Sequence, residues 1–180
     1  MNPNRKAFLD MLAVSEGTST HPLTKNSGYD VIVTGIDGPE IFADYSTHPF
    51  AHGRPPQIIN NKGLRSTASG RYQFMLKDWA HYKAALSLPD FGPGSQDLWA
   101  IQLIRERGAL PLIDGGQFSV AVQRCSNLWA SLPGAGYGQH ENSLDKLREA
   151  YLAAGGELYN NKPLPVIATE DATWGNEVRR

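Results

Sequence analysis

The chain has 180 residues, of which 41% are hydrophobic and 19% are charged, as is ordinary for a globular protein. The formal net charge is −1 and the lysines and arginines are scattered, so we expect neither nucleic acid nor a membrane as a stable partner. The length suits one domain with a sizeable core. We place this domain at residues 1–160 and expect residues 161–180 to form an irregular or partly disordered tail.

Two features bear on the compartment in which the protein works. Cys125 is the single cysteine, so no internal disulfide forms and folding does not require an oxidising environment. The N-terminal segment M-N-P-N-R-K has no long apolar run, which predicts neither a secretory signal nor a membrane anchor. We therefore expect the protein to remain in the cytoplasm where it is made unless another factor releases it.

The first predicted helix carries an acidic residue at its last turn. Its apolar stripe recurs at helical spacing and consists of Phe8, Leu9, Met11, Leu12 and Ala13. Asn2-Pro3 or Asn4 starts the helix and Gly17 ends it. The Glu16 carboxyl then lies along the apolar face at the negative end of the helix dipole, and both effects disfavour ionisation. Such a carboxyl suits a general acid, although a surface glutamate on a frayed helix end gives the same local pattern.

The remaining elements are a small hairpin and further helices. Tyr29–Thr34 and Ile41–Tyr45 favour strands on either side of a turn at Ile36–Glu40. Prolines and glycine predict a long irregular loop over Ser46–Ser69. Four helices are expected to follow, from Gly70 to a stop at Pro89 and then over Gln96–Arg107, Gln117–Leu132 and Ser143–Ala154. The predicted fold class is α+β, mostly helical with a small β-hairpin near the N-terminal third.

A metal site is not expected in the long loop. His48 and His52 have a spacing that suits metal binding on a helix, but flanking prolines argue against a helix there. The neighbouring sequence offers no cysteine and no third ligand. We therefore predict no metal and no other cofactor.

Two further stretches have unusual compositions. S-T-A-S-G-R-Y-Q-F, over Ser66–Phe74, reads as a flexible turn running into a helix, which places Gln73 in the first helical turn. L-P-G-A-G-Y-G-Q, over Leu132–Gln139, has three glycines that let the backbone approach a ligand, with Tyr137 as its large side chain. A sugar ring, with apolar faces and many hydroxyls, suits such groups. Taken singly, the two stretches read equally well as a helix cap and an inter-helix turn.

In combination, these motifs resemble the lambda-type phage endolysins, which are peptidoglycan transglycosylases with a lysozyme-like fold. The resemblance runs over residues 5–155 through R-K-A-F-L-D-M-L-A, S-E-G-T, G-Y-D-V-I-V, S-T-A-S-G-R-Y-Q, R-E-R-G-A-L-P and R-C-S-N-L-W-A-S-L-P-G-A-G-Y-G-Q. It implies that Glu16 is the catalytic acid/base. The implied substrate-binding residues are Ser15, Asp30, Tyr72, Gln73, Tyr137 and Gln139. The hairpin turn and the proline-rich loop differ in length from the family pattern, and the tail after Gly156 does not match it.

The resemblance also implies a reaction and a setting. The substrate is the β-1,4 bond between N-acetylmuramic acid and N-acetylglucosamine in peptidoglycan glycan strands, and the product carries a 1,6-anhydro ring. A hydrolysing muramidase is the nearest alternative and needs a second carboxylate, for which Asp30 and Asp44 are available. A non-catalytic wall-binding module is the more distant one. We expect a monomer that stays in the host cytoplasm until a holin permeabilises the membrane and then reaches the periplasm and cell wall.

Overall fold

The computed structural model of the chain describes residues 1–138 and 140–159, and the predicted tail at 161–180 lies outside these residues. The helices are α1 (Pro3–Ser15), α2 (Leu76–Ala85), α3 (Pro93–Glu106), α4 (Leu110–Asp114), α5 (Phe118–Cys125) and α6 (Leu144–Ala153). Two antiparallel strand pairs are β1 (Val31–Gly35) with β2 (Gly38–Ile41) and β3 (Gln57–Ile58) with β4 (Arg65–Ser66). The predicted α+β class, mostly helical with a small early hairpin, is confirmed.

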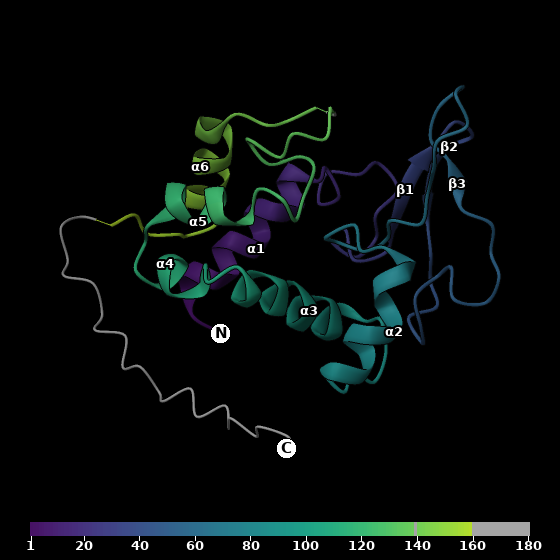
Figure 1. Cartoon of the computed structure of the whole chain (residues 1–180), viewed down its shortest axis with the longest axis horizontal. Helices are drawn as coiled ribbons and strands as arrows, with labels where there is room; N and C mark the ends of the chain where they lie inside the picture. The colour runs from purple at the N-terminus through teal and green to yellow at the C-terminus, as the bar shows by residue number, and fades with distance from the viewer. Residues whose placement is uncertain (139, 160–180) are drawn as a thin grey trace, which may run out of the picture.

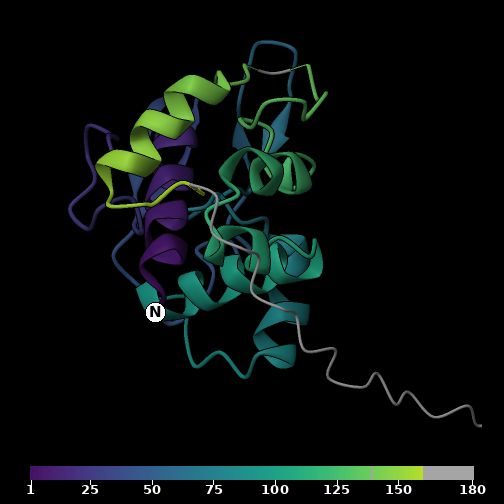
Figure 2. The same cartoon turned by 90° about the vertical axis from the view of Figure 1, so that its left-hand side faces the viewer.

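The helices and strands occupy different ends of the molecule. Figure 1 shows α1, α4, α5 and α6 grouped at one end and the strands at the other, with α3 running between the two toward α2. Figure 2 shows α6 lying alongside α1, in agreement with the close packing of these two helices. Among the described residues, no helix is long and apolar enough to cross a lipid bilayer.

Helix α1 begins and ends as its sequence predicts. The Asn2 side chain caps it by accepting the Asn4 backbone N–H at 2.8 Å, and Pro3 opens the first turn. At the other end Gly17 adopts a φ of 70°, and the Thr18 N–H returns to the Ala13 carbonyl at 3.0 Å. This Schellman arrangement closes the last turn. It leaves Glu16 as the C-cap residue, at a fixed place on the helix end.

The core is built around aromatic side chains where α3 meets α2 and the preceding turn. Trp99 is 1% exposed and stacks on Phe74, with ring centroids 4.0 Å apart and an interplanar angle of 7°. Trp79 and Tyr82 of α2 pack on the same indole, at 5.8 and 5.2 Å between centroids. Such contacts bury large apolar areas and have preferred geometries. They fix the turn before α2 against α3, as expected for a central, buried helix.

The prediction that a helix starts at Gly70 is wrong, because α2 starts at Leu76. Gly70 has a φ of 78° and Gln73 a φ of 52°, and neither value belongs to a right-handed helix. A Cβ atom on Gly70 would lie 2.3 Å from the Gln96 Oε1 atom, so the turn approaches α3 too closely for any larger residue. Gln96 accepts the Arg71 N–H at 2.8 Å and thereby replaces the missing helical bond.

The hairpin and the long loop also differ from prediction. The second strand is β2, over Gly38–Ile41, rather than Ile41–Tyr45, because Gly35 pairs with Gly38 across a tight turn. The predicted loop contains the β3–β4 pair, which the prolines around it disguise in the sequence.

Two predicted helices are shorter or start elsewhere, and one is confirmed nearly as expected. The helix expected over Gln117–Leu132 ends at Cys125, where a turn begins. Helix α4 was not predicted, since its five residues are too few for a periodic pattern. Helix α3 begins at Pro93 rather than Gln96. Helix α6 is confirmed within one residue at each end, with the Ser143 side chain as its cap.

Candidate active site

Glu16 lies at the C-terminal end of α1 with its carboxyl half-buried. Its Oε1 atom accepts a short hydrogen bond from the Ser131 hydroxyl, from a loop 115 residues further along the chain. Burial raises the pKa of Glu16 to about 7, and the hydrogen bond from Ser131 offsets part of that rise. A carboxyl with this pKa can both give and take a proton near neutral pH, which is what general acid/base catalysis requires.

Ser15 lies behind Glu16 and faces protein rather than solvent. Ser15 is 7% exposed, and its Oγ atom is 2.7 Å from the Ser131 Oγ atom. The Asn142 side-chain amide donates to the Ser15 carbonyl at 3.0 Å and to the Ser15 Oγ atom at 3.2 Å. Ser15 thus contacts the partner of Glu16. Sequence reasoning missed Ser131 and Asn142, which precede and follow the glycine-rich motif at Leu132–Gln139.

Asp30 is buried at the start of β1 and both of its oxygens are engaged. The residue is 3% exposed, with Oδ1 accepting the Thr24 hydroxyl and Oδ2 accepting the Lys25 backbone N–H at 2.8 Å. These bonds close the loop that precedes β1. Asp44, the other candidate carboxylate, is exposed and accepts the Ser46 N–H at 2.8 Å, an interaction that lowers its pKa.

Tyr72 and Gln73 belong to the turn before α2 and have different surroundings. Tyr72 is 1% exposed and donates its hydroxyl to Asp97 at 2.6 Å, next to the Tyr29 hydroxyl, which donates to the same carboxylate oxygen at 2.8 Å. Gln73 is half-buried, and its side-chain amide donates to the Gly70 carbonyl at 3.0 Å. Tyr72 is therefore a buried structural residue, whereas the Gln73 side chain is partly exposed at the surface.

The turn is fastened to the end of α1. The Thr18 hydroxyl donates to the Arg71 carbonyl at 2.6 Å, and the buried Arg71 guanidinium pairs with Asp10 of α1 at 2.7 Å. These two contacts connect the turn that bears Gln73 to the helix that bears Glu16.

Tyr137 stands on the glycine-rich loop and is 57% exposed. Its hydroxyl donates to the Asn127 carbonyl at 2.9 Å, which holds this exposed side chain against the preceding turn. The Glu141 carboxylate accepts the backbone N–H groups of Gly134 and Gly136 at 2.8 Å each, which closes the loop on itself. Gln139, the remaining predicted sugar-binding residue, lies outside the described residues.

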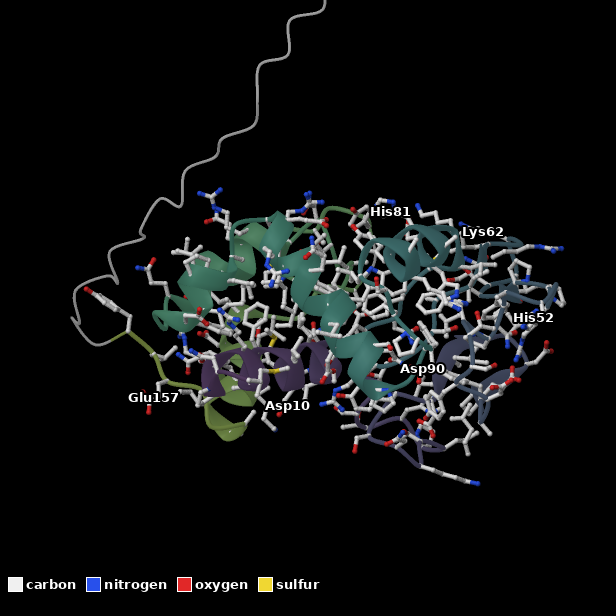
Figure 3. The ribbon with its side chains drawn as sticks, turned by 90° about the horizontal axis from the view of Figure 1, so that it is seen from below. Asp10, His52, Lys62, His81, Asp90 and Glu157 are labelled. Atoms are coloured by element: carbon white, nitrogen blue, oxygen red, sulfur yellow. The ribbon has the colours of Figure 1, made fainter. Side chains whose placement is uncertain are left out.

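The two histidines of the long loop differ in their surroundings. His48 is fully buried, and its ring nitrogens contact the Phe74 carbonyl at 3.0 Å and the Phe50 N–H at 3.3 Å. Burial lowers its pKa, which suits a neutral, structural ring. Figure 3 shows His52 at the end of the molecule opposite Glu157. Over residues 1–138 and 140–159, no three His, Cys, Asp or Glu side chains are grouped to hold a metal ion.

The fold matches solved lysozyme structures closely. The structure of bacteriophage lambda lysozyme complexed with a chitohexasaccharide is 53% identical and gives a TM-score of 0.80, over 88% of this chain and 97% of that one. A second structure of lysozyme from bacteriophage lambda is 52% identical, with a TM-score of 0.76 and the same coverage. The chain therefore has the lysozyme-like fold that the sequence resemblance implied.

Sequence comparisons narrow this class to a family. The endolysin of Escherichia phage P2 is 66% identical over 154 residues, which are 85% of this chain and 93% of that one. The endolysin of Escherichia phage lambda is 54% identical over 159 residues, which are 88% and 95% of the two chains. The family model for endolysins matches residues 6–158. The chain belongs to the endolysin family, and it is a peptidoglycan-cleaving enzyme of phage lysis.

Proposed function

We propose that the enzyme cleaves the β-1,4 bond between N-acetylmuramic acid and N-acetylglucosamine by intramolecular transglycosylation, with Glu16 as the only catalytic carboxyl. The observation that carries this proposal is the contrast among the three candidate carboxyls. Burial raises the pKa of Glu16 to about 7, and the carboxyl has one hydrogen-bond partner among the described residues, whereas Asp30 has both oxygens engaged inside the fold. Asp44 holds a surface turn.

The proposed reaction uses Glu16 twice. The protonated carboxyl gives its proton to the glycosidic oxygen as the C1–O4 bond breaks and an oxocarbenium-like centre develops on the muramic acid. The carboxylate then takes the proton of that sugar's C6 hydroxyl, whose oxygen attacks C1 and closes the 1,6-anhydro ring. No water is consumed and Glu16 ends protonated, as it began.

Product analysis tests the proposal. Mass spectrometry of the fragments released from purified peptidoglycan should show 1,6-anhydromuramic acid ends, which are lighter by one water than reducing ends. A hydrolysing muramidase acting on the same material provides the matched control. Reducing muramic acid ends from this enzyme would favour hydrolysis, in which a second carboxylate about 5–9.5 Å from the first activates water or forms a glycosyl-enzyme.

We propose that the sugar is held by exposed groups and that buried ones position them. Tyr137 is exposed and Gln73 is half-buried, so these two would contact the glycan directly. The family resemblance adds Gln139 to them. Ser15, Asp30 and Tyr72 are buried, and their contribution to binding would pass through the residues they support. Tyr137→Ala should therefore weaken glycan binding, with little change in the melting temperature.

The proposed setting is a phage-infected cell, with the enzyme acting as a monomer once a holin has opened the membrane. Turbidity of an expressing bacterial culture should stay steady until chloroform is added and should then fall. Spontaneous lysis without chloroform would instead indicate an export route for the chain.

A further inference from the structure

We infer that a directed chain of hydrogen bonds, from Lys146 through Asn142, Ser15 and Ser131, determines which oxygen of Glu16 carries the catalytic proton. The chain begins on α6, crosses to the end of α1 and then reaches the loop that bears Ser131. Asn142 and Lys146 are positioning residues in this scheme, since they act on Glu16 through the two serines. The inference rests on the proposed role of Glu16 as the acid/base.

The four links are consecutive. The Lys146 ammonium donates to the Asn142 Oδ1 atom at 2.7 Å, and the Asn142 Nδ2 atom donates to the Ser15 Oγ atom at 3.2 Å. The two serine oxygens are 2.7 Å apart, and the Ser131 hydroxyl donates to the Glu16 Oε1 atom. Ser15 and Asn142 are 7% and 5% exposed, so bulk water does not compete for the middle links.

The direction of the chain follows from what each group can donate. An ammonium has no lone pair and only donates, so the Asn142 carbonyl oxygen must face Lys146 and its NH₂ group must face Ser15. Ser15 has a single hydroxyl proton and already accepts from Asn142, so it can donate to Ser131. The Ser131 Oγ atom, at 2.7 Å, is a nearer acceptor than the Ser131 carbonyl oxygen, at 3.5 Å. The Ser131 hydroxyl in turn donates its hydrogen bond to the Glu16 Oε1 atom. Hydrogen bonds aligned in this way polarise and strengthen one another.

The end of the chain matters for catalysis. Oε1 receives the Ser131 proton whether Glu16 is ionised or neutral, so in the neutral acid the exchangeable proton is held on Oε2. The same bond favours the ionised form and opposes the effect of burial. Glu16 therefore presents one defined oxygen for both proton transfers.

Two other carboxylates on the surrounding elements, those of Asp10 and Glu141, have partners of their own. Asp10 of α1 pairs with Lys6 at 2.7 Å and with Arg71 of the turn at 2.7 Å. Glu141 of the glycine-rich loop holds two backbone N–H groups. Lys146 is the charged group tied to Glu16 through hydrogen bonds, and burial rather than a neighbouring charge is the main cause that raises the pKa of Glu16.

The test measures the ionisation of Glu16 directly, in full-length protein labelled with ¹³C at glutamate side chains. The carboxyl resonance of Glu16 is identified by its loss in Glu16→Gln and is titrated by NMR. Ser131→Ala and Asn142→Asp should each raise the midpoint, the first by about one to two pH units. Asn142→Asp is nearly isosteric, yet its carboxylate can only accept, so it draws the Ser15 proton away from Ser131 and reverses the chain. Ser131→Thr keeps the hydroxyl and should keep the midpoint.

A pair of charge-matched variants separates the chain from general electrostatics. Lys146→Met should raise the Glu16 midpoint by a smaller amount, because only the outer polarising charge is lost. Arg148→Met removes the same charge from the same helix, where the guanidinium contacts Asp145 and Ser119 instead, and it should leave the midpoint unchanged. Thermal melts identify variants that fold, and if Asn142→Asp does not fold, the Ser131 and Lys146 variants decide the question.

The outcomes distinguish the inference from the proposed function. A Glu16 midpoint unchanged in folded Ser131→Ala, or moved equally by Lys146→Met and Arg148→Met, overturns the chain. A midpoint that moves as expected, while the alkaline limb of the lytic pH profile stays in place, supports the chain and overturns Glu16 as the catalytic acid. Parallel movement of both supports the inference in full.

Discussion

A carboxyl lies at the end of α1 and another at the start of β1, and the two differ in their burial and in the hydrogen-bond donors around them. Glu16 is half-buried and accepts one side-chain donor among the described residues. Burial disfavours its ionised form, the hydrogen bond from Ser131 offsets only part of that effect, and the pKa rises to about 7. Asp30 is more deeply buried but receives a hydroxyl and a backbone N–H, one on each oxygen. Among the described residues, the two carboxyls thus differ in the donors they receive, one for Glu16 and two for Asp30.

The comparison predicts that removing the Glu16 acid has the largest effect on activity. Glu16→Gln should fold normally and lose at least about 10²–10⁴ in rate, and more if one residue serves both proton transfers. Dye release from labelled peptidoglycan measures the loss, and circular dichroism checks the fold. Lysis near the wild-type rate by the folded variant would remove Glu16 from the mechanism.

The converse expectation holds for Asp30. Asp30→Asn keeps the shape but turns one acceptor into a donor, which opposes either the Thr24 hydroxyl or the Lys25 N–H. We expect unfolding by urea to show a loss of about 1–3 kcal/mol, the range for leaving a buried donor or acceptor unsatisfied. Turnover should remain measurable and the product should stay anhydro. A folded Asp30→Asn protein as inactive as Glu16→Gln would instead favour a two-carboxylate hydrolase.

These two regions also show what the sequence can and cannot predict. The place of Glu16 follows from local rules, because an apolar stripe and a terminating glycine suffice to locate the helix end. Its hydrogen-bond partner does not, since Ser131 is 115 residues away and Asn142 lies 127 residues from Ser15. Contacts at such separations depend on how α6 packs on α1, and no local periodicity encodes that packing.

The turn before α2 gives the same lesson for the fold. Arg71 and Gln73 are good helix formers, yet Gln73 adopts a φ of 52°. The Gln96 side chain of α3 bonds the Arg71 N–H and approaches Gly70 closely, so tertiary contacts override the local preference. Tyr72, which the family resemblance assigns to sugar binding, is 1% exposed, and its hydroxyl donates to Asp97, a partner that its sequence motif does not reveal.

A third prediction concerns the stability cost of the raised Glu16 pKa. A carboxyl whose pKa is higher in the folded state favours folding below the unfolded pKa, and this advantage is lost as pH rises through about 7. Glu16→Gln should therefore be more stable than the wild type at pH 8, by about 1–2 kcal/mol after allowance for solvent screening, and similar to it at pH 4. Thermal melts at the two pH values measure the difference. A variant equally stabilised at both would point to packing rather than ionisation.

The smallest effect is expected at Asp44, which completes the set of candidate carboxyls. Its carboxylate lies at the surface and accepts the Ser46 N–H, so Asp44→Asn keeps an acceptor in place while removing the charge. The hydrogen bond lowers the pKa of Asp44, and the small stability it contributes at neutral pH is already absent in acid, below the folded pKa. We expect the melting temperature of Asp44→Asn to stay within about 2 °C of the wild type, with turnover and anhydro product unchanged. Asp44→Ala, which loses the acceptor as well, serves as the comparison for the turn. A large fall in turnover for the asparagine variant alone would mean that the charge at this position acts on the substrate. The single-carboxyl mechanism would then give way to a two-carboxylate mechanism that uses Glu16 and Asp44.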